Sequence, residues 1–306
     1  MNRPLESLQS VAPRPKLDVL VPVSGRILNC GSRQLPLSQP QVMAVLNITP
    51  DSFSDGGELS SLEPARLRAH AEELVAAGAT ILDIGGESTR PGAAPVTATE
   101  ECYRVLPVLE LLLDLDVVLS VDTSKAAVAV RALELGCHMI NDVTGLGDPE
   151  MLGVLADSQA AVALMHMQGA PRTMQTDPQY SDVVGEIYGF LSERLQACRN
   201  HGISEDRLCI DPGFGFGKTI THNLTILRQL YSFNNLDAAI MVGLSRKSLI
   251  GALTGRPVTE RMAGSVAAAL LAVQAGADIV RVHDVAATVD ALKVLSSVTS
   301  SNLPDS

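Results

Sequence analysis

The chain has 306 residues, a formal net charge of −11, 46% hydrophobic residues and 19% charged residues. This length accommodates two average domains or one large α/β barrel, and the composition is typical of a core-rich globular protein. The negative charge argues against a nucleic-acid partner, and no apolar run is long enough to span a membrane. The cysteines form no C-x-x-C pair, so we expect free thiols and no zinc site. The N-terminal residues contain no apolar segment of the secretory type, so we expect a cytoplasmic location.

The pattern along the chain predicts three parts. Residues 1–40 are rich in Pro, Ser and Gln around a short apolar patch, which predicts an N-terminal tail and a lead-in hairpin or strand. Residues 41–298 form a regular alternating region, and residues 299–306 form a short C-terminal tail.

Eight short apolar runs of the parallel-strand type recur in the alternating region. They cover 42–49, 80–86, 117–123, 139–144, 161–167, 208–213, 239–245 and 279–284. Amphipathic helical stretches separate them, and several of these end in Gly followed by Ala or Cys, a C-cap signal. Buried strands alternating with helices predict a (β/α)8 TIM barrel with a short N-terminal extension. A doubly wound open sheet is the alternative, less favoured because polar residues follow nearly every strand.

Polar side chains stand at or just past the carboxyl end of each predicted strand. They are Asn47, Glu87, Thr89, Arg90, Asp122, Asn141, Asp142, His166, Asp211, Ser245, Arg246, Lys247, Arg281 and His283. A single residue of this kind could be a helix cap or a loop contact. Their presence at the same end of all the strands predicts the catalytic face of a barrel.

Asp122, Asn141 and Asp211 lie among apolar residues, where isolated charges are expensive. Because Lys and Arg fall mostly on predicted helices and loops, we expect few protein partners for these carboxylates. A flat, nitrogen-rich ligand would satisfy them, since a carboxylate pairs bidentately with adjacent N–H groups.

The opposing basic set consists of Arg90, Lys247, Arg281 and His283. Arg281 and His283 are two residues apart on the last predicted strand, so both side chains should face the lumen, near the loops where barrels commonly hold phosphate. We therefore expect a ligand with a heteroaromatic end and an anionic end. The loops 47–58 and 85–95 are interpreted as movable lids, and Asn47 as an oxygen ligand for Mg²⁺ on a diphosphate.

The stretch 210–219, IDPGFGFGKT, is close to a nucleotide-binding loop without matching one. A P-loop requires G-x-x-x-x-G-K-[ST], and Pro212 replaces the first glycine of that pattern. We therefore expect no phosphate-binding role for Lys218, and interpret the glycines as allowing a tight turn beside Asp211.

Eight segments, from about residue 42 onward, resemble the dihydropteroate synthase family of pterin-binding enzymes. They are LNITPDSFSDGG, DIGGESTRPGA, SVDTSK, INDVTG, MHMQGAPRTMQ, IDPGFGFGKT, GLSRKSLIG and RVHDV, in the order of the family. The resemblance implies a transferase of folate biosynthesis that condenses 6-hydroxymethyl-7,8-dihydropterin diphosphate with p-aminobenzoate. The products are diphosphate and 7,8-dihydropteroate.

The resemblance also implies a role for each matching residue. The residues that resemble the pterin-binding set are Asp122, Asn141, Met165, Asp211 and Lys247. Those that resemble the diphosphate-binding set are Asn47, Thr89, Arg90, Arg281 and His283, with Asn47 as the Mg²⁺ ligand. Those near the p-aminobenzoate pocket, where sulfonamides compete, are Phe53, Thr89, Arg90, Pro91 and Ser248. The predicted catalytic residues are Asp122, Lys247, Arg281 and His283.

Two alternatives remain open from the sequence. A methyltetrahydrofolate methyltransferase domain shares the barrel and the pterin carboxylates, but has no use for Thr89, Arg90 or the Arg281/His283 pair. A non-catalytic pterin-binding homologue would show eroded lid loops or phosphate-binding residues, and both are intact. The Ala/Leu-rich helix at 264–276 favours a homodimer, as in the family.

Overall fold

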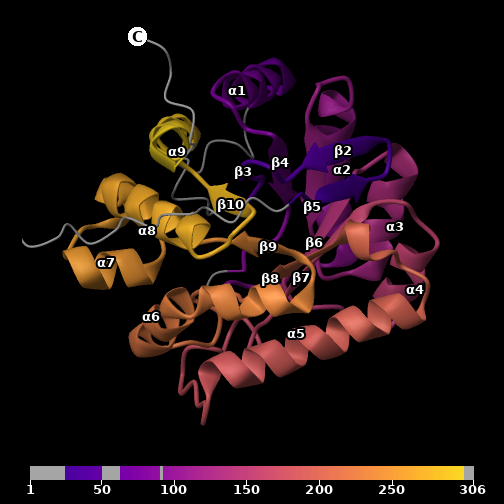
Figure 1. Cartoon of the computed structure of the whole chain (residues 1–306). Coiled ribbons are helices and arrows are strands. Elements are labelled where there is room, and N and C mark those ends of the chain that lie inside the picture. The colour runs from indigo at the N-terminus through magenta and orange to yellow at the C-terminus, as the bar shows by residue number, and fades with distance from the viewer. Residues whose placement is uncertain (1–24, 50–62, 90–91, 300–306) are drawn as a thin grey trace, which may run out of the picture.

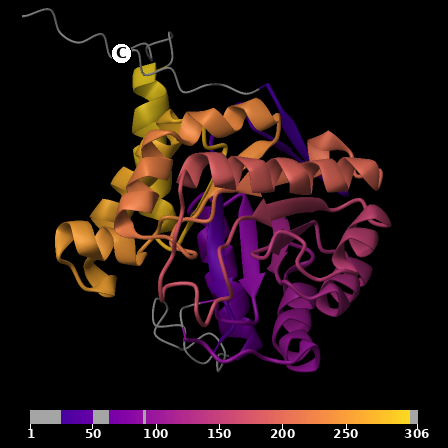
Figure 2. The same ribbon diagram turned by 90° about the horizontal axis from the view of Figure 1, so that it is seen from below.

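The structure is a computed structural model, and it describes residues 25–49, 63–89 and 92–299. The barrel strands are β3 (Gln41–Asn47), β4 (Ile81–Gly85), β5 (Val118–Asp122), β6 (Met139–Asp142), β7 (Ala161–Met165), β8 (Leu208–Asp211), β9 (Ala239–Val242) and β10 (Ile279–Val282). They are parallel, and β10 pairs with both β3 and β9 (Figures 1 and 2). The barrel is therefore closed, which confirms the (β/α)8 prediction and excludes the open sheet.

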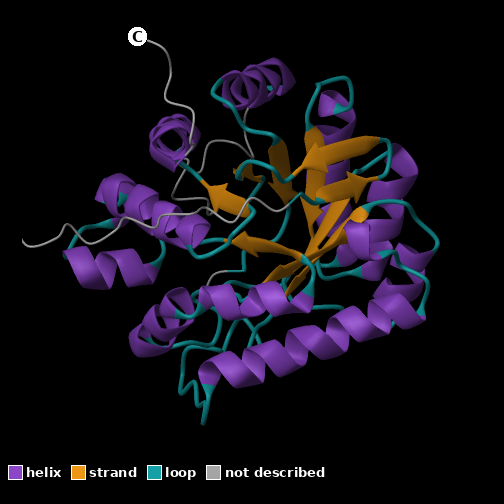
Figure 3. Ribbon diagram, in the orientation of Figure 1, coloured by secondary structure: helices purple, strands orange, loops and turns teal. Residues whose placement is uncertain are grey.

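Helices cover the outside of the barrel (Figure 3). They are α1 (Pro64–Ala76), α2 (Ala98–Leu112), α3 (Ala126–Leu135), α4 (Met151–Ala156), α5 (Val183–Asn200), α6 (Ile220–Arg228), α7 (Ser248–Thr254), α8 (Met262–Gln274) and α9 (Val285–Thr299). Short 3-10 helices cover Glu205–Arg207, Leu230–Leu236 and Val258–Glu260. The C-cap signal is visible at Gly136, whose φ of 104° ends α3. Within the described ranges no helix is long and apolar enough to cross a membrane.

An antiparallel hairpin, β1 (Ile27–Cys30) with β2 (Arg33–Pro36), precedes the barrel. Its buried Leu28 and Leu35 belong to the same apolar cluster as Met43, Ile81 and Met139, which lie near the amino ends of their strands. The hairpin thus packs against the amino end of the barrel lumen and leaves the carboxyl end available for the site.

The lumen changes from apolar to polar along the strands, because alternate residues of a strand face the same side. In β4, Ile81 belongs to the apolar plug, and Asp83 two residues later is fully buried. In β6, Met139 is followed in the same way by Asn141. The polar layer is therefore placed by strand geometry toward the carboxyl ends.

Candidate active site

Asp83 is at the centre of a hydrogen-bonded network inside the barrel. Its Oδ1 accepts from Ser120 Oγ at 2.6 Å, and its Oδ2 accepts from Asn141 Nδ2 at 3.0 Å and from Arg281 Nε at 2.6 Å. Because the Asp83 side chain is completely buried, these donors are what make its charge tolerable. Asp83 is absent from the predicted site because it lies in the middle of β4. The two-residue period of the strand was the signal that could have identified it.

Arg281 joins this network to Asp122. Its Nη2 donates to Asp122 Oδ2 at 3.0 Å, while Nε binds Asp83. Of the carboxylates expected to have few protein partners, Asp122 thus has one cationic partner, and that guanidinium lies on a strand and also pairs with Asp83. Burial lowers the pKa of Arg281, but Asp83 and Asp122 outweigh burial and raise it above its ordinary value. Burial raises the pKa of Asp122 above its ordinary value, and Arg281 opposes that rise.

Asp211 and Lys247 are two further ionisable residues of the same site, and each affects the pKa of the other. Asp211 Oδ1 accepts from the Gly213 N–H at 2.7 Å. Lys247 Nζ donates to the Phe214 carbonyl and lies 4.6 Å from the centre of the Phe216 ring. Burial raises the pKa of Asp211, opposed mainly by Lys247, and burial lowers the pKa of Lys247 to about 8, opposed mainly by Asp211. Each of the two groups therefore favours the charged form of the other.

Lys218 is buried under the turn formed by residues 212–217, with only 3% of its surface exposed. Its Nζ donates to the carbonyls of Gly213 and Phe216, each at 2.9 Å, and to the carbonyl of His166 at 3.3 Å. Gly213 has a φ of 73°, and a Cβ there would lie 1.9 Å from the His166 carbonyl oxygen, so only glycine fits. Lys218 thus holds the turn that supports Lys247, with its ammonium committed to protein carbonyls.

Replacing Lys218 by methionine is expected to change how stability depends on pH. Burial lowers the pKa of Lys218 to about 7 in the folded chain, against about 10.4 for an unfolded lysine. Between these values the unfolded state binds more protons, so the free energy of unfolding of the wild type rises with pH. The variant lacks this contribution, and the wild type should gain stability relative to it from about pH 7 to pH 10. Urea unfolding across that range measures the difference; parallel profiles would contradict the prediction.

Other predicted residues are placed around the same carboxyl ends. Met165 is 3% exposed and pairs in register with Asp211. At the end of β3, Asn47 Oδ1 lies 3.0 Å from the position that a Cβ on Gly85 would occupy, and Asp122 Cβ lies 3.7 Å from the same point. Glycine at this position therefore leaves room for the two polar side chains to approach each other.

The predicted anion-binding residues are only partly described. His283 follows β10, and its backbone N–H donates to Ser245 Oγ at 3.2 Å, while its Nδ1 lies 3.0 Å from the same oxygen. Thr89 is half-buried in the loop after β4, and Ser248 is exposed at the start of α7. The predicted contacts Phe53, Arg90 and Pro91, and the first predicted lid from residue 50 onward, lie outside the described residues.

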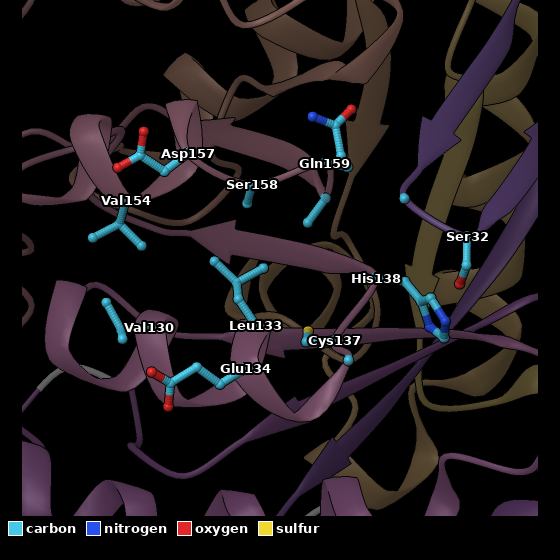
Figure 4. Close-up of a pocket in the computed structure, with 13 residues that line it drawn as sticks. Ser32, Val130, Leu133, Glu134, Cys137, His138, Val154, Asp157, Ser158 and Gln159 are labelled. Carbon is cyan, nitrogen blue, oxygen red and sulfur yellow. The ribbon is translucent and has the colours of Figure 1, made fainter.

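A cavity of about 640 Å³ lies at the opposite end of the barrel, beside α3 and α4 (Figure 4). His138 and Ala160, which line it, directly precede β6 and β7. Because Asp122 and Asp211 end their strands, this cavity and the charged network are on opposite faces. Catalytic sites of such barrels lie at the carboxyl ends, which favours the charged network over the cavity.

Comparison with known proteins agrees with this site. Residues 43–283 match the family model described as pterin binding enzyme. The chain is 47% identical over 267 residues to dihydropteroate synthase of Escherichia coli (strain K12), covering 87% of this chain and 94% of that protein. The Yersinia pestis dihydropteroate synthase in a sulfonamide drug complex is 46% identical, with a TM-score of 0.85 over 89% of this chain and 98% of that one. The Xanthomonas albilineans dihydropteroate synthase in complex with 7,8-dihydropteroate is 44% identical, with a TM-score of 0.78 over 90% and 99%.

The pterin-binding family model matches the whole of this closed barrel except its first residues, and the chain belongs to that family. Its identity to relatives over nearly their whole length places it among the dihydropteroate synthases, which are transferases. The resemblance seen in the sequence is confirmed. The methyltransferase and non-catalytic alternatives are set aside.

Proposed function

We propose that the chain condenses 6-hydroxymethyl-7,8-dihydropterin diphosphate with p-aminobenzoate, binding the pterin and the diphosphate at two ends of one charged site. The observation that carries this proposal is the network in which Arg281 forms ion pairs with both Asp83 and Asp122. Arg281 also affects the pKa values of Asp211 and Lys247, so these residues belong to the same electrostatic site. It offers acceptors for an N–H-rich ring and cations for a leaving anion within one site.

The pterin end is assigned to Asp122, Asn141, Asp211 and Lys247, with Met165 against the ring. A ligand that donates hydrogen bonds from adjacent N–H groups stabilises carboxylates most strongly when they are buried and only partly neutralised by the protein. Such a site also rejects analogues that lack those donors, by a factor on the order of 10⁴. Asp122 further offsets positive charge that develops on the pterin methylene when the C–O bond breaks.

The diphosphate end is assigned to Arg281, His283 and Thr89. In the reaction the C–O electron pair leaves with diphosphate, the amine nitrogen forms the new C–N bond, and its surplus proton passes to solvent. The guanidinium of Arg281 has five N–H donors, and its contacts to Asp83 and Asp122 leave donors for an anion. A preorganised donor of this kind contributes on the order of 10²-fold to 10³-fold in rate. The aniline nitrogen is neutral near pH 7 and requires no strong general base.

At the end of β3, Mg²⁺ would be held jointly by the protein and by the substrate diphosphate, and not by protein side chains alone. Within the described ranges no three His, Cys, Asp or Glu side chains are grouped to hold a metal. Asn47 supplies one amide oxygen beside Asp122, and Mg²⁺ commonly takes one or two protein ligands together with substrate phosphates. When bound there, Mg²⁺ would neutralise charge on the departing diphosphate.

Diphosphate release from the pterin substrate, measured with and without p-aminobenzoate, tests the proposed function. Product formation with both substrates, abolished by a chelator and restored by Mg²⁺, is expected. Release without the amine would favour a stepwise route, and release only with the amine a concerted one. Absence of 7,8-dihydropteroate under every condition would contradict the proposal.

We also propose a homodimer in the cytoplasm. Exposed apolar side chains gather on α7, α8 and α9, which lie on one side of the barrel (Figure 1); they are Leu253, Met262, Leu271, Val294 and Val298. An apolar patch of this kind is typical of a protein–protein interface. All five cysteines are free thiols, which supports a reducing compartment. A monomer in sedimentation equilibrium at micromolar concentration, or recovery from an oxidising compartment on cell fractionation, would contradict these assignments.

A further inference from the structure

Lys125 forms an ion-pair cluster next to the site, with Glu87 and Glu101. Its Nζ lies 2.5 Å from Glu87 Oε2 and 2.5 Å from Glu101 Oε2. The three residues come from different parts of the barrel wall: Glu87 follows β4, Glu101 lies in α2, and Lys125 stands three residues after Asp122, just before α3. Lys125 therefore links the loop after β4 to the loop after β5.

Glu101 is the most deeply buried residue of this cluster. Its side chain is completely buried, and within the described part of the chain its Oε1 has no hydrogen-bond partner. A buried carboxylate of this kind is held by its cation, since an unpaired charge would be strongly destabilising. A well-packed apolar residue could stabilise the fold as well as a buried ion pair does. The cluster is therefore better explained by positioning than by stability.

Glu87 connects the ion-pair cluster to the loop after β4. Its second oxygen, Oε1, accepts from the Val96 N–H at 3.0 Å, which ties the beginning of the loop to its end. The preceding Gly86 is pressed against α2, because a Cβ there would lie 2.7 Å from Val105 Cγ2 and 3.0 Å from Glu101 Cγ. Glu87 is thus held on two sides, two residues before Thr89.

We infer that Lys125 is a positioning residue for diphosphate binding. It holds Glu87 against Glu101 and so sets the place of Thr89 at the mouth of the site. The inference rests on the proposed function, in which Thr89 contacts the diphosphate. Lys125 itself contacts neither substrate: its ammonium is committed to the two carboxylates.

The test compares two ligands on the full chain carrying Lys125→Met. Isothermal calorimetry is done with 6-hydroxymethyl-7,8-dihydropterin, which lacks the diphosphate, and with its diphosphate ester. The affinity for the alcohol should stay within about twofold, because the pterin end is untouched, while the affinity for the ester falls about tenfold, the loss expected for one hydrogen bond to a charged group. Lys125→Arg should recover most of the loss because it keeps the charge and the donors.

Arg68→Met is the matched control. Arg68 also joins two carboxylates, Glu72 at 2.9 Å and Asp114 at 2.7 Å, but it does so between α1 and the turn after α2. Both ligands should bind this variant as they bind the wild type. If Lys125→Met fails to fold, Glu87→Gln provides the same comparison at a partly exposed position.

Equal loss of affinity for both ligands, or no loss for either, would overturn the inference about Lys125. Failure of the proposed function looks different: the wild type itself would then bind the ester no better than the alcohol and form no 7,8-dihydropteroate. The wild-type measurements in the same series separate these two cases.

Discussion

Arg281→Met is expected to lower kcat/KM by on the order of 10³-fold, because it removes a donor to the leaving diphosphate and disorganises two carboxylates at once. Asp83 is fully buried and Asp122 is 10% exposed, and both are paired with this one guanidinium. Removing one partner of a buried ion pair costs about 3–5 kcal/mol of stability. Steady-state kinetics and urea unfolding measure the two effects.

The double variant Asp83→Asn/Arg281→Met distinguishes these two roles. It removes the carboxylate that Arg281→Met leaves without its charged partner, so part of the lost stability should return. The activity should not return, because the donor to the diphosphate is still missing. A double variant no more stable than Arg281→Met alone would show that the Asp83–Arg281 ion pair does not carry the assigned stability.

Asp211→Asn is expected to reduce pterin affinity by on the order of 10³-fold while leaving the fold intact. The asparagine oxygen can still accept from the Gly213 N–H, which Asp211 binds at 2.7 Å. The second carboxylate oxygen, however, is replaced by an NH₂ group. This group is a hydrogen-bond donor, so it cannot accept a hydrogen bond from the N–H groups of the pterin.

The stability of the Asp211→Asn variant should change little or rise at neutral pH. Burial raises the pKa of Asp211, so the ionised carboxylate destabilises the folded state at any pH above its unfolded pKa of about 3.9. Asparagine has no such charge, although Lys247 loses a neighbour that favours its charged form. A large loss of stability, with pterin affinity unchanged, would assign Asp211 to the fold and not to the ligand.

The barrel was predictable because its signals are local. Seven of the eight barrel strands lie within the predicted apolar runs, and β3 begins one residue before its run, at Gln41. Buried parallel strands are recognisable as continuous apolar segments, and the helices between them as amphipathic ones. The strand-end residues Asp122 and Asp211 were found for the same reason: a polar residue that closes an apolar run stands out. Position relative to the strand end predicted that both side chains lie at the carboxyl end of the barrel.

Contacts between distant residues were not predictable in this way. Asp83 is 198 residues from Arg281 in sequence, and their pairing depends on barrel closure between β10 and β3. The polarity of Asp83 is also hidden inside a strand, where only the two-residue period shows that it faces the lumen. Lys218 could be excluded as a phosphate ligand from the altered motif, but its burial against three carbonyls follows from the folded turn.

The proposed function requires one site that binds the pterin through its acidic residues and the diphosphate through its basic ones. Calorimetric titration of the wild type and of Asp211→Asn, with the pterin alcohol and with its diphosphate, tests this requirement. Asp211→Asn should weaken the binding of both ligands by the same factor, because both carry the ring assigned to Asp211. Wild-type affinity for the alcohol, with weakened binding of the diphosphate alone, would contradict this requirement.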